Sequence, residues 1–134
     1  MARSMYDVIK LNVGGQEFVT TRDTLTSCPG SLLSMMFDLN STWSLAYCGN
    51  GVYFLDSDPK YFSIILNWLR HRQDQMYSLI IILFNFFVTY RELIIDQYQE
   101  VYFENILKIA KYFNLQDLCE LIKKELQHWS PGSL

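Results

Sequence analysis

Residues 8–21, VIKLNVGGQEFVTT, decide the fold of this chain, because they combine strand-like alternation with the turn of a tight β-hairpin. Gly14 and Gly15 are free to take positive φ, as two-residue hairpin turns require. The predicted cross-strand pairs are Val13 with Gln16, Leu11 with Phe18, and Ile9 with Thr20. One face is then mostly apolar and the other mostly polar. A slip of one residue would bury charges, so the register is well specified.

The hairpin and two later segments together resemble the potassium-channel tetramerisation-domain family of the BTB/POZ fold. The first match is the Asn-Val-Gly-Gly run at 12–15, followed by Phe18 and the Thr-Leu pair at 24–25. The second is GVYFLDSDPKYFSIILNWLR at 51–70, and the third is AKYFNLQDL at 110–118. The three motifs stand in the family's order, and the resemblance covers 7–72 and 90–127.

The resemblance implies an α+β domain of the BTB/POZ type, with a small mixed three-stranded sheet and a surrounding cluster of about five helices. We assign residues 1–6 to an N-terminal arm, 7–127 to the tetramerisation domain and 128–134 to a C-terminal tail.

Local signals in the sequence predict the elements after the hairpin. Ser31 is a suitable cap for a helix over 32–37, and Asp58 with Pro59 opens a helix whose apolar residues recur at 62, 65, 66 and 69. Asn50 and Gly51 predict a turn before a strand at 52–56, with 45–48 as a candidate partner strand. Asn114 suits the left-handed residue between two final helices, over 101–113 and 115–127.

The stretch 71–89 departs from the family pattern, because joining residue 70 directly to residue 90 restores it. Its apolar part, 76–88, would span about 20 Å as a helix, short of the ~30 Å hydrocarbon core of a membrane. We therefore expect an atypical insertion rather than a transmembrane span. It is either an extra buried helix or strand, or intronic sequence translated in frame as an artefact of the gene model.

Composition limits the classes of function. The 134 residues carry a net charge of −3, with 50% hydrophobic and only 19% charged residues. Nucleic-acid binding depends on an excess of Lys and Arg at the phosphates, which this chain lacks. The small share of charged residues favours a surface that another subunit covers.

The three cysteines do not form a metal-binding or disulfide pattern. Cys28, Cys48 and Cys119 are widely spaced, and neither His71 nor His128 stands at ligand spacing from them. We expect reduced thiols, no metal and no cofactor. The N-terminus has no secretory signal, so a cytoplasmic or nuclear setting fits best.

The sequence does not predict an enzyme. Gly14 and Gly15 lack the frame of a phosphate-binding loop, and the residues after them continue as a strand. Asp58 is explained as a helix cap, and Asp56 as a strand-end or interface residue.

The resemblance implies self-assembly into tetramers or pentamers through polar contacts around the hairpin and the flanking helices. The alternative, from the residues alone, is a solvated polar face. Ser57 stands where the family often has Arg, which removes a cross-subunit ion-pair partner from Asp56. By position, the implied interface residues are Lys10, Asn12, Glu17, Thr21, Arg22, Asp56, Asp58 and Arg70.

Members of the family without transmembrane helices commonly act as adaptors that hold a cullin scaffold for ubiquitination. The residues at the matching positions are Phe37, Asp38, Asn40, Tyr112 and Asn114. The alternative function is the cytoplasmic tetramerisation domain of a voltage-gated potassium channel subunit. A third class, the transcription-factor-like BTB domain, would form a dimer.

Overall fold

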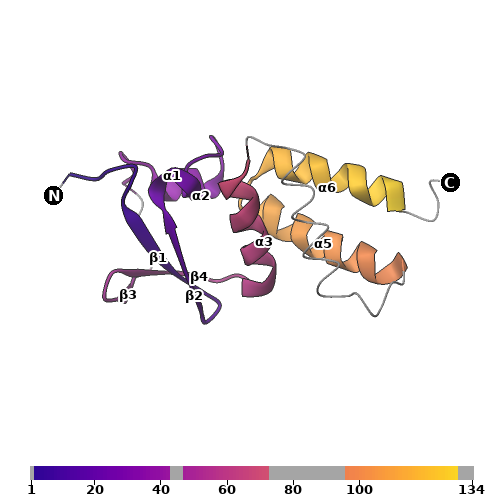
Figure 1. Ribbon diagram of the computed structural model, residues 1–134, viewed down its shortest axis with the longest axis horizontal. Helices are drawn as coiled ribbons and strands as arrows, with labels where there is room; N and C mark the ends of the chain where they lie inside the picture. The colour runs from indigo at the N-terminus through magenta and orange to yellow at the C-terminus, as the bar shows by residue number, and fades with distance from the viewer. Residues whose placement is uncertain (1, 43–46, 73–95, 130–134) are drawn as a thin grey trace.

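The computed structural model describes residues 2–42, 47–72 and 96–129. Figure 1 shows the sheet near the N-terminal end of the molecule, the α5–α6 pair at the other end, and α3 between them. The strands are β1 (Val8–Val13), β2 (Gln16–Thr21), β3 (Tyr47–Gly49) and β4 (Val52–Leu55). The helices are α1 (Arg22–Leu25), α2 (Leu32–Phe37), α3 (Pro59–Arg70), α5 (Asp96–Tyr112) and α6 (Gln116–Trp129).

The hairpin forms in the predicted register. All three expected pairs are present, with Val13 opposite Gln16 next to the turn. Gly14 and Gly15 both have positive φ, 55° and 100°. The inward residues of β1, Ile9, Leu11 and Val13, are buried, so the apolar face of the hairpin does cover the core.

The sheet is mixed, as expected, and has the order β2-β1-β4-β3. Strand β4 lies parallel to β1, and β3 lies antiparallel to β4. Asn50 and Gly51 take positive φ, 54° and 76°, and so form the turn that their sequence predicts. The short β3 makes four strands in the part of the chain that the structure describes. Strand β3 overlaps the segment 45–48, which the sequence predicts as a candidate partner for β4. Residues 45 and 46 of that segment lie outside the described residues.

Helix α3 lies at the centre of the core. The Asp58 side chain accepts a hydrogen bond from the Lys60 amide at 2.9 Å, and Pro59 occupies the first turn, so the helix starts as predicted. All four residues of the expected stripe are buried. The Phe62 ring packs edge-on against Phe18 of β2, at 5.3 Å between centroids, and against Phe113, at 5.8 Å. This helix therefore joins the sheet to the C-terminal helices.

The two last helices pack against each other, and α5 also packs against α3. Asn114 has a φ of 55° and ends the first of them in the predicted left-handed conformation. In the N-terminal half of the chain, the Ser31 hydroxyl accepts a hydrogen bond from the Ser34 amide at 3.1 Å and caps α2. The Leu32 amide then donates to the Phe113 carbonyl at 2.7 Å, which fixes α2 against the end of α5.

Only the first two residues of the stretch 71–89 are described. His71 ends α3, and Arg72 donates to the Ser27 carbonyl at 2.8 Å and pairs with the Asp117 carboxylate. The Arg72 guanidinium also lies over the Trp68 ring, 5.7 Å from its centroid. These two residues are thus part of the folded domain, while 73–89 lies outside the described residues. Within the described ranges, no helix combines the length and apolar character needed to cross a membrane.

Candidate interaction surfaces

The face of the sheet opposite the core is open in the described chain. We call it the outer sheet face, and the strand register puts Val8, Lys10, Asn12, Glu17, Val19, Thr21, Val52 and Phe54 on it. Val8 is 64% exposed and Val19 is 50% exposed, and Phe54 is also exposed. Apolar and polar side chains are thus mixed on one open sheet face, a composition that is common in contact surfaces.

Three of the predicted interface residues are exposed charges whose side chains have no hydrogen-bond or ion-pair partner among the described residues. They are Lys10 and Glu17 on the outer sheet face and Asp56, which directly follows β4. Because these charges are of both signs and are free, they are available to pair across a contact with another molecule.

Three other predicted interface residues are used within the chain. The Asn12 side chain accepts from the Gly15 amide at 2.8 Å and so supports the hairpin turn. Thr21 accepts from the Thr24 amide at 3.3 Å at the start of α1, and Asp58 caps α3. Their polar character is explained by turn and cap formation before any interface is considered.

Arg70 connects the end of α3 to the free edge of the sheet. Its Nη2 donates to the Val19 carbonyl at 3.0 Å, and its Nη1 donates to the Asn67 side chain at 3.1 Å. Among the described strands, β2 has only β1 as a neighbour, and Val19 faces Lys10 in a pair whose main-chain groups point away from β1. The Arg70 side chain therefore occupies an outward carbonyl of an edge strand.

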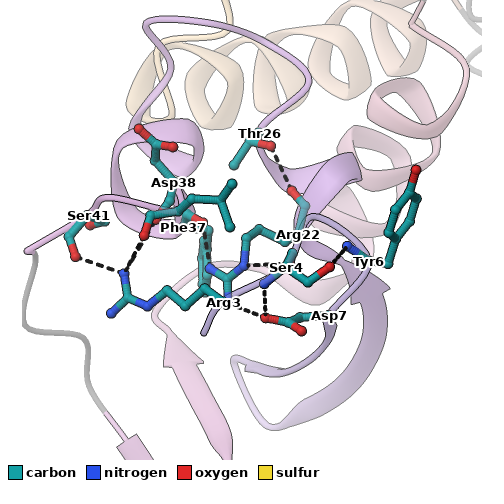
Figure 2. Close-up of polar contacts among 10 residues, drawn as sticks. Arg3, Ser4, Tyr6, Asp7, Arg22, Thr26, Phe37, Asp38 and Ser41 are labelled. Atoms are coloured by element: carbon teal, nitrogen blue, oxygen red, sulfur yellow. Dashed lines mark hydrogen bonds and ion pairs between the residues drawn. The ribbon is translucent and has the colours of Figure 1, made fainter. Parts of the chain in front are cut away.

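Arg22 is placed differently from the other predicted interface residues, because it is only 8% exposed. Its Nη1 donates to the Phe37 carbonyl at 2.6 Å and its Nε to the Ser4 carbonyl at 3.2 Å. Its Nη2 contacts the Asp7 carboxylate at 3.3 Å (Figure 2). The guanidinium is thus fully engaged inside the chain. The position-based inference missed this, because a sequence does not show how deep an arginine lies.

The positions implied for a cullin lie at the C-terminal end of α2, in the loop after it, and at the end of α5 and just beyond. Asp38 and Asn40 are exposed beyond the end of α2, and Tyr112 is 65% exposed at the end of α5. Phe37 is 1% exposed and packs edge-on against Tyr53, so it is a core residue here. The Asn114 side chain donates to the Gly30 carbonyl at 2.9 Å.

The sequence analysis did not single out two exposed apolar residues of these surfaces, Met35 on α2 and Phe54 on β4. Met35 lies within a helix already fixed against the end of α5 by the bond between Leu32 and Phe113. We call the exposed residues Met35, Asp38, Asn40 and Tyr112 the α2–α5 corner: the first three lie on α2 or just beyond it, and Tyr112 ends α5 next to Phe113. The exposure of Met35 could have been predicted from helical periodicity, because Met35 lies on the side of the helix opposite Leu33 and Phe37.

Cys28 and Cys119 are free and buried, and burial raises the pKa of both thiols. The side chain of Cys48 lies outside the described set. Within the described residues, no group of three or more His, Cys, Asp and Glu side chains is arranged to hold a metal ion.

Comparison with known proteins assigns the fold to a family. Residues 9–85 match the model of the BTB/POZ domain, and the match extends into the stretch 71–89. Human BTB/POZ domain-containing protein KCTD9 is 44% identical over 68 residues, which are 50% of this chain and 18% of that protein.

Two longer matches support the same assignment. Human KCTD5 is 29% identical over 119 residues, covering 89% of this chain and 42% of that protein. Human KCTD17 is 31% identical over 119 residues, covering 89% and 31%. The chain thus spans less than half the length of these relatives. It belongs to the BTB/POZ domain family, in its potassium-channel tetramerisation type, and is a protein-interaction and oligomerisation domain.

Proposed function

We propose that the chain is the self-assembling, cullin-binding domain of an adaptor for a cullin-RING ubiquitin ligase. It has no catalytic role in this proposal, forms a tetramer or pentamer, and acts in the cytoplasm, with the nucleus as a second location. The observation that carries the proposal is the presence of two separate exposed surfaces, the outer sheet face and the α2–α5 corner.

The outer sheet face supports self-assembly. Val8 and Val19 supply apolar area, and Lys10 and Glu17 supply opposite charges without partners among the described residues. Contacts between proteins commonly combine an apolar centre with a polar rim. In a ring, a patch of one protomer meets a different patch of the next, so Lys10 of one copy would lie near an acidic residue of its neighbour, either Glu17, elsewhere on the outer sheet face, or Asp56, beyond β4.

The self-assembly proposal is tested by measuring molar mass with light scattering after size-exclusion chromatography. We expect a tetramer or pentamer for the unchanged chain and smaller species for Lys10→Glu, since like charges across a contact are repulsive. A Lys10→Glu, Glu17→Lys double variant should recover mass if these residues pair between protomers. Lys108→Glu, at an exposed position of α5, is the matched control and should leave the mass unchanged.

The α2–α5 corner supports a second partner. Met35 and Tyr112 are exposed apolar residues, and Asp38, three residues after Met35, adds a carboxylate that has no hydrogen-bond or ion-pair partner among the described residues. Phe37 is buried against Tyr53, so in this proposal it holds α2 in place and does not itself touch the partner. A purified cullin should bind the chain in calorimetry. Tyr112→Ala should weaken that binding by about 1–2 kcal/mol, as expected for an exposed aromatic contact, with Lys108→Ala as the control.

The same experiments decide among the alternatives. A tetramer that binds no cullin would favour the assembly domain of a channel subunit. A two-subunit mass would favour a dimeric BTB domain of the transcription-factor type. A monomer at micromolar concentration would contradict the self-assembly proposal, and equal cullin binding by Tyr112→Ala would remove the α2–α5 corner from it.

A further inference from the structure

Two arginines, Arg3 of the N-terminal arm and Arg22 of α1, contact the end of α2 and the loop behind it. Figure 2 shows Arg3 and Arg22 approaching from the arm and from α1 towards the same stretch of main chain. Arg22 Nη1 donates to the Phe37 carbonyl at 2.6 Å, and Arg3 Nη1 lies 2.9 Å from the Ser41 carbonyl and 3.3 Å from that of Leu39. A third carbonyl, that of Asp38, lies 3.5 Å from the same nitrogen.

One of these contacts meets a need of α2 itself: Arg22 binds the carbonyl of its last residue, Phe37, whereas the acceptors of Arg3 belong to the loop after the helix. The helix has six residues, so it is too short to be stable alone, and the carbonyls at its C-terminal end lack partners within the helix. Positive side chains at that end satisfy the carbonyls and oppose the helix dipole. One Arg3 nitrogen carries two N–H groups, so the two nearest carbonyls, of Ser41 and Leu39, are its principal acceptors.

The arm is itself held in place by a closed set of bonds. The Asp7 carboxylate accepts from the Ser4 amide at 2.9 Å and from Arg22 Nη2 at 3.3 Å. The Arg22 Nε donates to the Ser4 carbonyl at 3.2 Å, and the Asp23 amide donates to the Met5 carbonyl at 2.9 Å. Arg3 directly precedes this fixed segment, so its direction towards the loop is determined by Ser4, Asp7 and Arg22.

We propose that residues 2–7 act as a clasp that sets the conformation of the loop at 38–41, with Arg3 and Arg22 as its positioning residues. The loop carries Asp38 and Asn40, so the clasp also controls how these side chains are presented to a protein partner. The second part rests on the proposed function, whereas the first part does not. Removing the Arg3 side chain loosens the loop without altering the outer sheet face.

The test is amide hydrogen exchange at residues 39–42 in the full chain, followed by NMR. Arg3→Ala should raise exchange at these amides about three- to tenfold, because an exposed charge-assisted bond contributes modestly to stability. Asp7→Asn should give a smaller rise, since it weakens the segment that directs Arg3. Arg70→Ala is the matched control: it also removes an arginine from a main-chain carbonyl, that of Val19, yet should leave this loop unchanged.

Cullin affinity and molar mass are measured on the same variants. We expect Arg3→Ala to bind a cullin about three- to tenfold more weakly, in step with the exchange, and to keep the molar mass of the unchanged chain. Unchanged exchange in Arg3→Ala would overturn the clasp. Faster exchange in a chain that never binds a cullin would keep the clasp and reject the proposed function. Faster exchange with undiminished cullin binding would reject the control of partner presentation.

Discussion

A Cβ atom on Gly14 would lie 2.4 Å from the carbonyl oxygen of Ser57, so the hairpin turn and the connection between β4 and α3 touch through their backbones. The Gly14 amide also donates to the Leu55 carbonyl at 3.1 Å. The glycine at this position therefore meets two requirements, a positive φ and a close approach of two main chains.

Replacing Gly14 should be more damaging than replacing its neighbour. Gly15→Ala introduces only backbone strain, about 1–3 kcal/mol, because open space surrounds that position. Gly14→Ala adds a steric clash and should cost at least about 3 kcal/mol in the free energy of unfolding. Urea denaturation measures both. Equal losses, or unchanged NMR shifts at residues 55–59 in Gly14→Ala, would contradict the close approach.

Removing the hydroxyl of Thr20 should stabilise the folded protein. The residue is buried, and its Oγ1 has no hydrogen-bond partner among the residues that the structure describes. A buried hydroxyl without a partner is unfavourable, so Thr20→Val should raise the free energy of unfolding by about 1 kcal/mol. Thr20→Ser, which keeps the hydroxyl and removes the methyl group, should lower it. If Thr20→Val is destabilising, the hydroxyl has a partner in solution.

The buried thiols should resist alkylation. Burial raises the pKa of Cys28 and Cys119 above the ordinary 9.0, so little thiolate forms near neutral pH, and the sulfurs are shielded as well. Iodoacetamide labelling, followed peptide by peptide with mass spectrometry, should be slow in the native chain and fast in denaturant. Rapid labelling of either residue in the native chain would show that the structure around it opens readily.

Asp7 should titrate at lower pH than an ordinary aspartate. Its pKa is lowered from 3.8, first by the hydrogen bond from the Ser4 amide and then by Arg22. A lowered pKa in the folded state stabilises the protein above pH 3.8, and this contribution is lost as the pH falls through the folded value. An NMR titration should show the shift, and Ser4→Pro, which lacks the amide proton, should move the pKa back towards 3.8. An unchanged pKa in Ser4→Pro would show that Arg22 alone is responsible.

Local sequence rules predicted the fold well because they concern neighbours in the chain. The Gly14–Gly15 turn, the Asp58 cap and the left-handed Asn114 are each decided by a few adjacent residues, and all three are confirmed. The BTB/POZ assignment followed from three such segments in order. The short β3 was only a candidate, since its pairing depends on β4 rather than on its own few residues.

The candidate surfaces were harder to predict, because exposure depends on contacts between distant segments. Arg22 and Arg70 look alike in sequence, but one is buried against the carbonyl of Phe37, 15 residues away, and the other reaches Val19 from the end of α3. Phe37 and Tyr112 are both aromatic, yet one is in the core and the other is on the surface. The exposure of Phe54 could not be predicted from its own strand, because it depends on the pairing with Asn12, which puts Phe54 on the outer sheet face.

The bond from Arg70 to the Val19 carbonyl also bears on how copies of the chain are kept from polymerising. An uncovered edge strand is a template on which further strands can add without limit, as in fibrils. A guanidinium seated on an outward carbonyl of β2 removes one of the acceptors that an incoming strand would need. Growth by strand addition is thereby obstructed at that edge of the sheet.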